Sequence, residues 1–183
     1  ENPIILQLGG STPASLSLAA RIAQDYGYDG INLNVGCPSD RVQSGAFGAC
    51  LMKNPELVAE CLGAMQSSVT IPVSIKHRIG VDELDSEEWL HEFVGRLADA
   101  GVRNFVIHAR KAWLNGLSPA ENRKIPPLKH VWVHNLKRAF PHLIIETNGE
   151  IKSLDQVHEH LKTVDGVMIG RAASDNPWLF STD

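Results

Sequence analysis

The chain has 183 residues, 43% of them hydrophobic and 21% charged, with a formal net charge of -4. This length and composition suit one domain with one core, and they exclude a disordered chain and a protein that binds nucleic acid through bulk positive charge. No apolar stretch is long enough to cross a bilayer, so we expect no membrane partner. The three cysteines, at positions 37, 50 and 61, form no CxxC pair, which favours reduced thiols in the cytoplasm over disulfides or structural zinc.

The two ends of the sequence predict a fragment. Residues 1–3 contain no initiator Met and lead at once into an apolar run, and residues 181–183 follow the first residues of a predicted helix. We therefore expect residues 1–183 to form the central and C-terminal part of a single domain, with further chain on both sides.

The first predicted strand covers residues 4–8 and ends at Gly9 and Gly10. A helix follows, with Pro13 in its first turn and Gly27 at its end, because proline suits the first turn of a helix and glycine suits its end. Apolar residues recur along this helix at helical spacing. They form one stripe: Leu18, Ala19, Ile22, Ala23 and Tyr26.

The second strand carries the strongest functional signal. Alternating apolar residues over 31–35 run into Gly36, Cys37 and Pro38, so a thiol stands where a strand ends and a loop begins. In proteins that alternate strand and helix, such loops carry the active site. Cys37 lies in a polar loop that does not suit a buried cysteine, so it is the candidate reactive group. Cys50 and Cys61 lie in apolar stretches and are predicted to be core residues.

Strands and helices continue to alternate along the rest of the chain. Further strands are predicted over residues 72–76, 105–108, 143–147 and 166–169. Further helices are predicted to begin near Asn54, Ser86, His130 and Ser153. The clearest helix has Asp85 or Ser86 as its cap and an apolar stripe of Leu90, Phe93, Val94, Leu97 and Ala98. The long connection over 109–129 indicates a functional loop.

Six strands alternating with helices imply an α/β fold with a parallel sheet, either open and doubly wound or closed into a barrel. Polar residues recur at the carboxyl ends of the strands: Gln7, Asn34, Lys76, His108, Asn148 and Arg171. A barrel gathers such residues at one mouth, whereas an open sheet concentrates them at one switch point. We therefore predict a TIM (β/α)8 barrel that is incomplete here, with about six of its eight strand-helix units.

Three strand-end residues suit a flat, electron-rich ligand. Lys76 could be an ordinary surface lysine, but His77 and Arg78 beside it make a basic cluster. His108 could be a core histidine, but its register with Lys76 across adjacent strands favours a function. Gln7 could satisfy backbone groups, and its amide also suits the edge of a heterocycle.

Two further motifs have competing explanations. Trp113 with Arg110 and Lys111 forms either an apolar plug with solvated charges or an aromatic and basic platform for a base and its phosphates. The run HVWVH over 130–134 has two histidines four apart but lacks the glutamate of an HExxH zinc site. We predict surface or packing histidines there, and no metal site.

These groups together predict a barrel mouth with a phosphate cradle, amide and cationic groups for a heterocycle, and a thiol that can move a proton. The cradle would use the glycine turns at 148–149 and 170–171, after the last two strands. FMN is the ligand that fits this set. Facing a flavin, Cys37 would be the general acid that completes reduction of a double bond after hydride delivery.

Six stretches resemble the dihydrouridine synthase family, most closely the type that acts on tRNA at positions 20 and 20a. They are QLGG (7–10), NLNVGCPSDRVQSGAFGACLM (32–52), SIKHRIG (74–80), IHARKAWLNGLSPAENRKIPPL (107–128), TNGEI (147–151) and DGVMIGRAASDNP (165–177). The resemblance extends over essentially the whole chain, and the stretch 107–128 is the most specific.

The resemblance implies roles for the site residues. Gln7, Lys76 and His108 match family residues that contact FMN. Two turns match the segments after the seventh and eighth barrel strands, the second of which is the phosphate site: Asn148, Gly149 and Glu150, then Gly170 and Arg171. Cys37 matches the proton donor, which protonates C5 of the uracil after hydride from flavin N5 reaches C6.

The resemblance also implies contacts with tRNA. Asn34 and Trp113 match positions that meet the RNA, Arg110 belongs to the basic platform beside Trp113, and Ala120 and Arg123 lie where subfamilies differ in RNA orientation. The implied reaction uses NADPH to reduce FMN and reduced FMN to reduce a uridine of the D-loop. That base must leave its stack to reach a pocket in a barrel mouth.

One position departs from the family pattern. Glu150 stands where the family usually has a second glycine, and a carboxylate there would repel a phosphate unless its side chain points away. The family's first barrel strand and its C-terminal helical domain are absent from this chain. Two other functions stay open at this point: a free-pyrimidine oxidoreductase on the same barrel, and a flavin-less RNA-binding scaffold.

Overall fold

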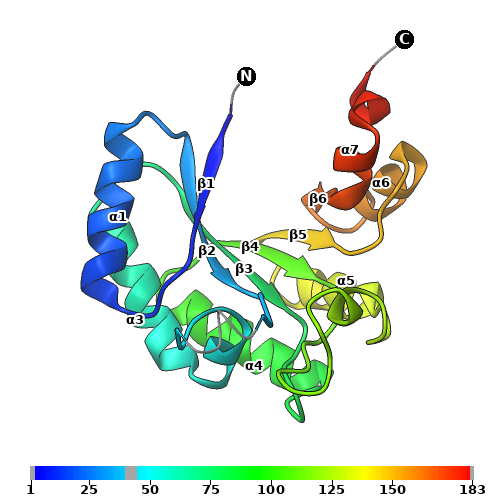
Figure 1. Cartoon of the computed structure of the whole chain (residues 1–183), viewed down its shortest axis with the longest axis horizontal. Helices are drawn as coiled ribbons and strands as arrows, with labels where there is room; N and C mark the ends of the chain where they lie inside the picture. The colour runs from blue at the N-terminus through cyan, green and yellow to red at the C-terminus, as the bar shows by residue number, and fades with distance from the viewer. Residues whose placement is uncertain (1–2, 40–44, 182–183) are drawn as a thin grey trace.

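The computed structural model describes residues 3–39 and 45–181 and shows an α/β fold built on one sheet (Figure 1). Its strands are all parallel and lie side by side in sequence order: β1 Ile5–Leu8, β2 Gly30–Val35, β3 Val73–Arg78, β4 Asn104–His108, β5 Ile144–Asn148 and β6 Gly166–Met168. The sheet curls, and most helices lie along its outer side. The predicted α/β class and parallel strands are therefore confirmed.

Helices connect the strands, as the alternating pattern predicts. They are α1 Pro13–Asp25, α3 Pro55–Gln66, α4 Glu87–Asp99, α5 His130–Ala139, α6 Leu154–Leu161 and α7 Arg171–Asp175. Short 3-10 helices add η1 Gly48–Lys53, η2 Glu121–Arg123 and η3 Pro177–Phe180. Within the two described ranges, no helix has both the length and the apolar character that a membrane crossing needs.

Local sequence signals explain where the central helices begin. The Asn54 side chain accepts a hydrogen bond from the backbone N–H of Leu57 at the start of α3. The Ser86 hydroxyl accepts one from the backbone N–H of Trp89 at the start of α4. Both contacts satisfy donors that the first turn of a helix leaves without a partner. The stripe predicted for α4 is confirmed, because all of its members are buried: Leu90, Phe93, Val94, Leu97 and Ala98.

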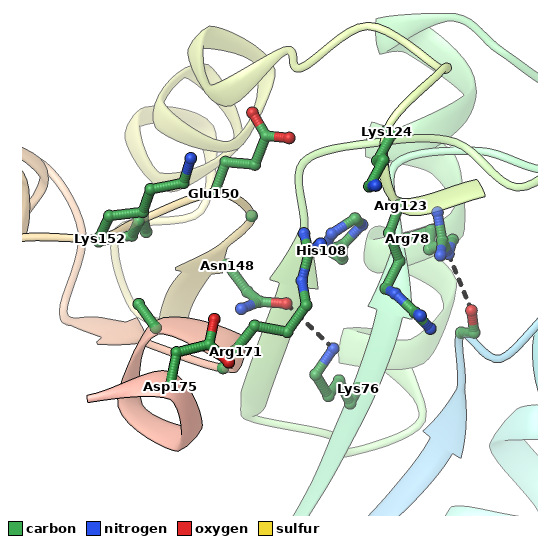
Figure 2. A pocket seen from close by; sticks show the side chains of 15 residues that line it. Lys76, Arg78, His108, Arg123, Lys124, Asn148, Glu150, Lys152, Arg171 and Asp175 are labelled. Carbon is green, nitrogen blue, oxygen red and sulfur yellow. Dashed lines mark hydrogen bonds between the residues drawn. The ribbon is translucent and has the colours of Figure 1, made fainter. Parts of the chain in front are cut away.

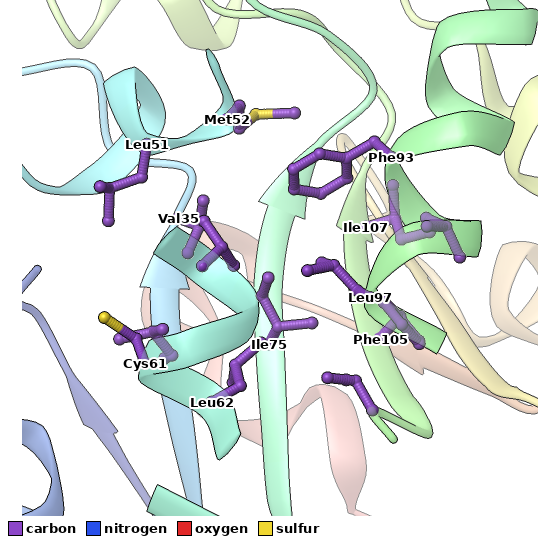
Figure 3. Close-up of a cluster of buried hydrophobic side chains, with 14 of the residues drawn as sticks. Val35, Leu51, Met52, Cys61, Leu62, Ile75, Phe93, Leu97, Phe105 and Ile107 are labelled. Atoms are coloured by element: carbon purple, nitrogen blue, oxygen red, sulfur yellow. The ribbon is translucent and has the colours of Figure 1, made fainter. Parts of the chain in front are cut away.

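The sheet separates apolar from polar side chains by alternation. On the outer face, Val35, Ile75 and Ile107 are fully buried beneath the helices (Figure 3). The opposite, inner face carries most of the polar residues of the strands: Gln7, Asn32, Asn34, Ser74, Lys76, Arg78, Asn104, His108, Glu146 and Asn148. Because successive strand residues point to opposite faces, one alternation builds both the core and the polar surface.

The strand register corrects one detail of the sequence analysis. His108 pairs with Arg78 on one side and with Asn148 on the other. Lys76 pairs with Val106, so the predicted register of His108 with Lys76 is off by two residues. A shift of two keeps both side chains on the same face of the sheet, and the two residues still share the inner face.

The stripe predicted for α1 is not its buried face. Leu18, Ile22 and Tyr26 are 52%, 48% and 82% exposed. The helix packs through Leu16, Ala20 and Ala23, of which only Ala23 belongs to the predicted stripe. Small side chains let a helix approach its neighbours closely, so the alanines take the packed face although the larger residues have equally good helical spacing.

His77 belongs to the core and not to the predicted basic cluster. Its ring is fully buried, with its centroid 5.1 Å from that of Phe93 and 6.0 Å from that of Phe105. Burial lowers the pKa of His77 to about 4. The neutral ring donates its Nδ1–H to the backbone carbonyl of Arg78 at 2.7 Å. Alternation along β3 turns Lys76 and Arg78 to the inner face and His77 to the outer face.

Candidate active site

The carboxyl ends of β3 to β6 surround a cavity of about 570 Å³ (Figure 2). Its lining comes from strand ends, from the long loop after β4 and from α7: Gly36, Lys76, Arg78, His108, Arg123, Lys124, Asn148, Gly149, Glu150, Ile151, Lys152, Gly170, Arg171, Ala172 and Asp175. The structure therefore brings together Lys76, His108, Asn148 and the two predicted glycine turns, from four different strands.

The cavity is strongly cationic within an acidic chain. Its lining includes six cationic side chains, Lys76, Arg78, Arg123, Lys124, Lys152 and Arg171, against the carboxylates of Glu150 and Asp175. The chain as a whole has a net charge of -4. Such a local reversal of sign focuses the field on an anionic ligand.

Lys76 lies deep in this cavity and has a depressed pKa. Its Nζ donates a hydrogen bond to Asn148 Oδ1 at 3.2 Å (Figure 2). The pKa of Lys76 is lowered to about 8, chiefly by burial and to a smaller extent by the Arg78 cation, while Cys37 acts in the opposite direction. The ammonium group can donate hydrogen bonds to a ring carbonyl or nitrogen of a ligand.

His108 presents a neutral imidazole to the cavity. Its pKa is lowered to about 2, chiefly by burial and also by the positive charges of Arg78, Lys76 and Arg110. Its Nδ1 is buried, and no hydrogen-bond partner for it lies among the described residues. A buried polar atom without a partner costs free energy, so this nitrogen is suited to contact a bound ligand.

Arg78 is a structural cation that sequence reasoning assigned only to a basic cluster. Its Nε donates to the Gly36 carbonyl at 2.8 Å, which anchors the loop that carries Cys37. Its NH1 donates to the carbonyls of Lys111 and Asn122, both at 2.9 Å. One side chain thus joins the end of β3 to the Cys37 loop and to the long loop after β4. The period-two pattern of β3 could have identified it.

Cys37 is half-buried at the mouth, beside the cavity lining rather than within it. Its neighbour Gly36 lines the cavity. The Cys37 backbone N–H donates to Asn34 Oδ1 at 3.0 Å, and its Sγ donates to Ser39 Oγ at 3.4 Å. The thiol is therefore held by a short polar turn at the end of β2, as the sequence predicted. Residues 40–44 of the same loop lie outside the described residues.

Gly149 shapes the turn after β5. Its φ is +130°, a backbone conformation that favours glycine, and a Cβ there would lie 2.9 Å from Leu128 Cδ2. Its carbonyl accepts a hydrogen bond from His130 Nε2 at 2.9 Å, and His130 Nδ1 accepts from the Thr147 hydroxyl at 2.9 Å. Since a carbonyl only accepts, Nε2 carries the proton.

His130 therefore holds the glycine turn and is not a surface residue. The other histidine of the HVWVH run, His134, meets a histidine of α6. His134 Nε2 lies 3.0 Å from His160 Nδ1 on α6. Among the described residues, no three histidine, cysteine or carboxylate side chains are arranged to hold a metal ion.

Glu150 points away from the glycine turns, toward the loop after β4 (Figure 2). Its Oε1 lies 2.9 Å from Arg110 NH2, and the buried Arg110 also donates from NH1 to the Pro126 carbonyl. Arg110 is therefore enclosed and paired. Its predicted place in an exposed RNA platform does not fit this burial. Glu150 has a φ of +51°, which explains why a glycine suits this position.

The long loop after β4 is organised by Asn122, which the sequence analysis did not single out. Asn122 is fully buried, accepts a hydrogen bond from the Trp113 N–H at 2.8 Å and donates to the Trp113 carbonyl at 2.9 Å. Lys111 Nζ lies 3.8 Å above the Trp113 ring and 3.0 Å from Asp85. Ala120 and Arg123 are exposed at the end of this loop, and Arg123 lines the cavity.

Comparisons with known proteins agree with this geometry. A family model described as dihydrouridine synthase matches residues 1–183. The chain is 61% identical over 182 residues to a tRNA-dihydrouridine(20/20a) synthase of Synechocystis sp., covering 100% of this chain and 54% of that protein. It is 60% identical to the Pasteurella multocida protein of the same name, with 98% and 55% covered, and 57% identical to that of Escherichia coli K12, with 99% and 53% covered. The chain thus spans about half the length of the curated relatives it matches.

Solved structures show the same fold at low sequence identity. A phosphoenolpyruvate phosphomutase from Streptomyces platensis superposes with a TM-score of 0.60 at 20% identity, covering 91% of this chain and 59% of that one. A putative phosphonomutase from Burkholderia cenocepacia gives a TM-score of 0.61 at 13% identity, covering 90% and 68%. At these identities the likeness concerns the fold alone.

Proposed function

Because this chain belongs to the dihydrouridine synthase family, we propose that the protein containing it reduces the C5–C6 double bond of uridine in the D-loop of tRNA, at positions 20 and 20a. The proposal includes FMN as the bound cofactor, NADPH as the electron donor and the cytoplasm as the location. Relatives at 57–61% identity that carry the corresponding name support the substrate.

The observation that carries the proposal is the cationic cavity with a neutral His108 at its wall. A flavin mononucleotide has a flat heterocycle with hydrogen-bonding edges and a phosphate at the end of a flexible chain. We infer that Gln7, Lys76 and His108 contact the heterocycle, since Lys76 donates hydrogen bonds and the Nδ1 of His108 has no partner within the described residues. FMN supplies hydride transfer when bound.

The phosphate of the cofactor fits the cationic side of the same cavity. In this proposal the turns at Gly149 and Gly170 give it room, and Arg171 neutralises its charge. Asn148 and Glu150 complete the segment after β5. The ion pair of Glu150 with Arg110 supports this placement, because it turns the carboxylate away from the phosphate.

In the proposed reaction, Cys37 delivers the proton that C5 of the uracil requires once hydride has reached C6. The thiol belongs at the mouth, where a base that has left its stack would arrive. We assign the RNA contacts to Asn34, Trp113, Ala120 and Arg123, which lie on the mouth and on the loop after β4. Arg110 acts through Glu150 instead of meeting the RNA directly.

We also infer that the curled sheet is part of a TIM (β/α)8 barrel, and that residues 1–183 supply about six of its units within one domain. Support comes from the curl, from the sequential strand order and from the inner face. Ile5 and Ile144, at the amino ends of β1 and β5, are 51% and 47% exposed there. The remaining strands of a barrel would cover such apolar groups.

The experiment that tests the function is mass spectrometry of tRNA from cells that lack the gene, complemented with the full-length protein or its Cys37→Ala form. We expect the wild-type protein to restore dihydrouridine. The variant should slow its formation by about 10²–10⁴-fold, the usual contribution of a general acid. FMN content of the purified variant should stay unchanged, because Cys37 does not line the cavity.

Other outcomes would point to other functions. Reduction of free uracil without activity on tRNA would identify a free-pyrimidine oxidoreductase and overturn the RNA assignment. A colourless full-length protein that binds tRNA would identify a flavin-less scaffold. Dihydrouridine formation that is equally fast in the Cys37→Ala variant would remove the thiol from the mechanism.

A further inference from the structure

A chain of side-chain amides crosses β1, β2 and β3 beneath the Cys37 loop. Asn32 Nδ2 donates a hydrogen bond to Ser74 Oγ at 2.9 Å, and Gln7 Nε2 donates to Asn32 Oδ1 at 2.7 Å. Asn34 Nδ2 then donates to Gln7 Oε1 at 2.8 Å. All four residues lie on the inner face of the sheet, and none of them is among the residues that line the cavity.

The upper end of this chain is fixed by the backbone. Asn34 Oδ1 accepts hydrogen bonds from the N–H groups of Gly36 and Cys37, both at 3.0 Å. A backbone N–H only donates, so the oxygen of Asn34 must face these two groups and its NH2 must face Gln7. The orientation of this amide therefore follows from chemistry and not from an arbitrary choice between its oxygen and nitrogen.

The remaining orientations follow in turn. Gln7 must direct its oxygen toward Asn34 and its NH2 toward Asn32, and Asn32 must direct its oxygen toward Gln7. The lower end is closed by Ser74, whose hydroxyl accepts from Asn32 and donates to the Ile31 carbonyl at 3.2 Å. Each link has one donor and one acceptor, so a single orientation satisfies the whole chain.

Burial distinguishes Asn32 and Gln7, the two middle members of the chain. Asn32 is 5% exposed, whereas Gln7 is exposed toward the open side of the sheet. Gln7 is therefore free to meet a ligand with the second proton of its NH2 group and the second lone pair of its oxygen. Asn32 is enclosed by its neighbours and can act only through them.

We propose that Asn32 is a positioning residue with two effects. It fixes the orientation of the Gln7 amide, so that Gln7 presents one donor and one acceptor to the ring of the cofactor. Through Gln7 and Asn34 it also steadies the Cys37 loop. This inference rests on the proposed function for the identity of the ring. The part that concerns the Cys37 loop depends only on the hydrogen bonds described above.

The test compares Asn32→Leu with Asn32→Asp in the full-length protein. Leucine has a similar volume but offers Gln7 no acceptor. Aspartate keeps an acceptor for Gln7, and its second oxygen can take the hydroxyl proton of Ser74. Ser74→Ala is the control, because it removes the far end of the chain and leaves the link from Gln7 to Asn34 in place.

Two measurements are made besides thermal stability. The first is the dissociation constant of FMN, with the visible absorption band of the bound flavin. The second is the rate at which iodoacetamide alkylates Cys37, followed by peptide mass spectrometry. We expect Asn32→Leu to weaken FMN binding about tenfold, as one unsatisfied polar group does, to shift the flavin band and to speed alkylation. Asn32→Asp should restore both readouts, and Ser74→Ala should change them less than Asn32→Leu.

The outcomes separate a positioning role from a purely structural one. Suppose that the Asn32→Leu and Asn32→Asp variants lower the melting temperature equally and change FMN affinity and the alkylation rate equally. Asn32 then only stabilises the fold, and the inference is overturned. Unchanged FMN affinity and unchanged alkylation in Asn32→Leu would also overturn it. If the wild-type protein binds no FMN, the proposed function fails, while the alkylation rates still decide whether Asn32 steadies the Cys37 loop.

Discussion

The central and C-terminal parts of this molecule hold their ends of the site in different ways. In the centre, α3 and α4 bury four and five residues against β2, β3 and β4. At the C-terminal end, neither α6 nor α7 contains a buried residue, and every residue of β6 is only partly covered. Lys76 and His108 thus stand on packed strands, whereas the Gly149 turn is held by a hydrogen bond from the His130 side chain. In the proposed enzyme, packing would position the heterocycle and hydrogen bonds would position the phosphate.

Core truncation should give the largest contrast between the two parts. Ile75→Ala removes a fully buried side chain on β3 and should lower the free energy of unfolding by about 2–5 kcal/mol. Leu161→Ala, on α6, removes a side chain that is 44% exposed and should change the free energy of unfolding by less than about 0.5 kcal/mol. Chemical denaturation of the full-length protein measures both. Equal losses would show that the C-terminal part is packed as firmly as the centre.

A pH series should reveal the buried histidine of the central core. The pKa of His77 is lowered from 6.5 to about 4, so between these values the unfolded state binds a proton that the folded state does not. The contribution of the neutral His77 ring to the free energy of unfolding should therefore be fully present above pH 6.5. It should decrease as the pH falls toward 4, by about 1.4 kcal/mol per pH unit. Denaturation midpoints between pH 4 and 7 give the slope.

The His77→Phe substitution should reduce the slope of unfolding free energy against pH by the contribution of one proton, about 1.4 kcal/mol per pH unit. His142→Gln, at an exposed histidine, is the matched control and should leave the slope unchanged. An identical slope in the His77→Phe variant would contradict the buried, neutral state of this ring.

Breaking one polar contact should loosen the C-terminal side without unfolding it. His130→Phe keeps a ring but removes the donor to the Gly149 carbonyl and the acceptor for the Thr147 hydroxyl. We expect FMN to bind about tenfold more weakly, because the glycine turn loses its support. His134→Phe, one helical turn further along α5, serves as the control. Equal weakening by both substitutions would argue against a specific role for His130.

The smallest expected effect comes from Glu150. Glu150→Gln removes a negative charge from the cavity wall and keeps an oxygen that can accept from Arg110. FMN affinity should rise about two- to fivefold, which corresponds to about 0.5–1 kcal/mol of repulsion at several ångströms. Titrations at low and high salt measure this, and the gain should shrink as salt screens the charge. A loss of affinity would mean that the carboxylate assists binding.

The sequence predicted the parts of the fold that depend on local signals. The Ser86 cap and the stripe of α4 were identified correctly, and so was the thiol at the end of β2. These features need only helix spacing, capping chemistry and a strand that runs into a polar turn. Nothing in them depends on a distant partner.

The sequence did not predict features that depend on which elements meet. Spacing alone could not show that α1 would bury Ala20 instead of Leu18, because both lie on apolar stripes. Asn32 and Asn122 were missed, and the contact of His130 with the Gly149 turn was not predicted, because their partners are distant in the sequence, as with Asn32 and Ser74. His77 is different, since the alternation of β3 already separates it from Lys76 and Arg78.

The two-sided sheet has a consequence for how such an enzyme can change over time. Every second strand residue lies on the inner face, where Lys76, Arg78, His108 and Asn148 line the cavity, and the residues between them support the fold, so the cavity lining can change by point substitution while the scaffold persists. A one-residue insertion within a strand has the opposite effect. It would exchange the two sets beyond that point, placing lysine and arginine beneath the helices and isoleucine in the mouth, so recognition and folding would be lost in a single event.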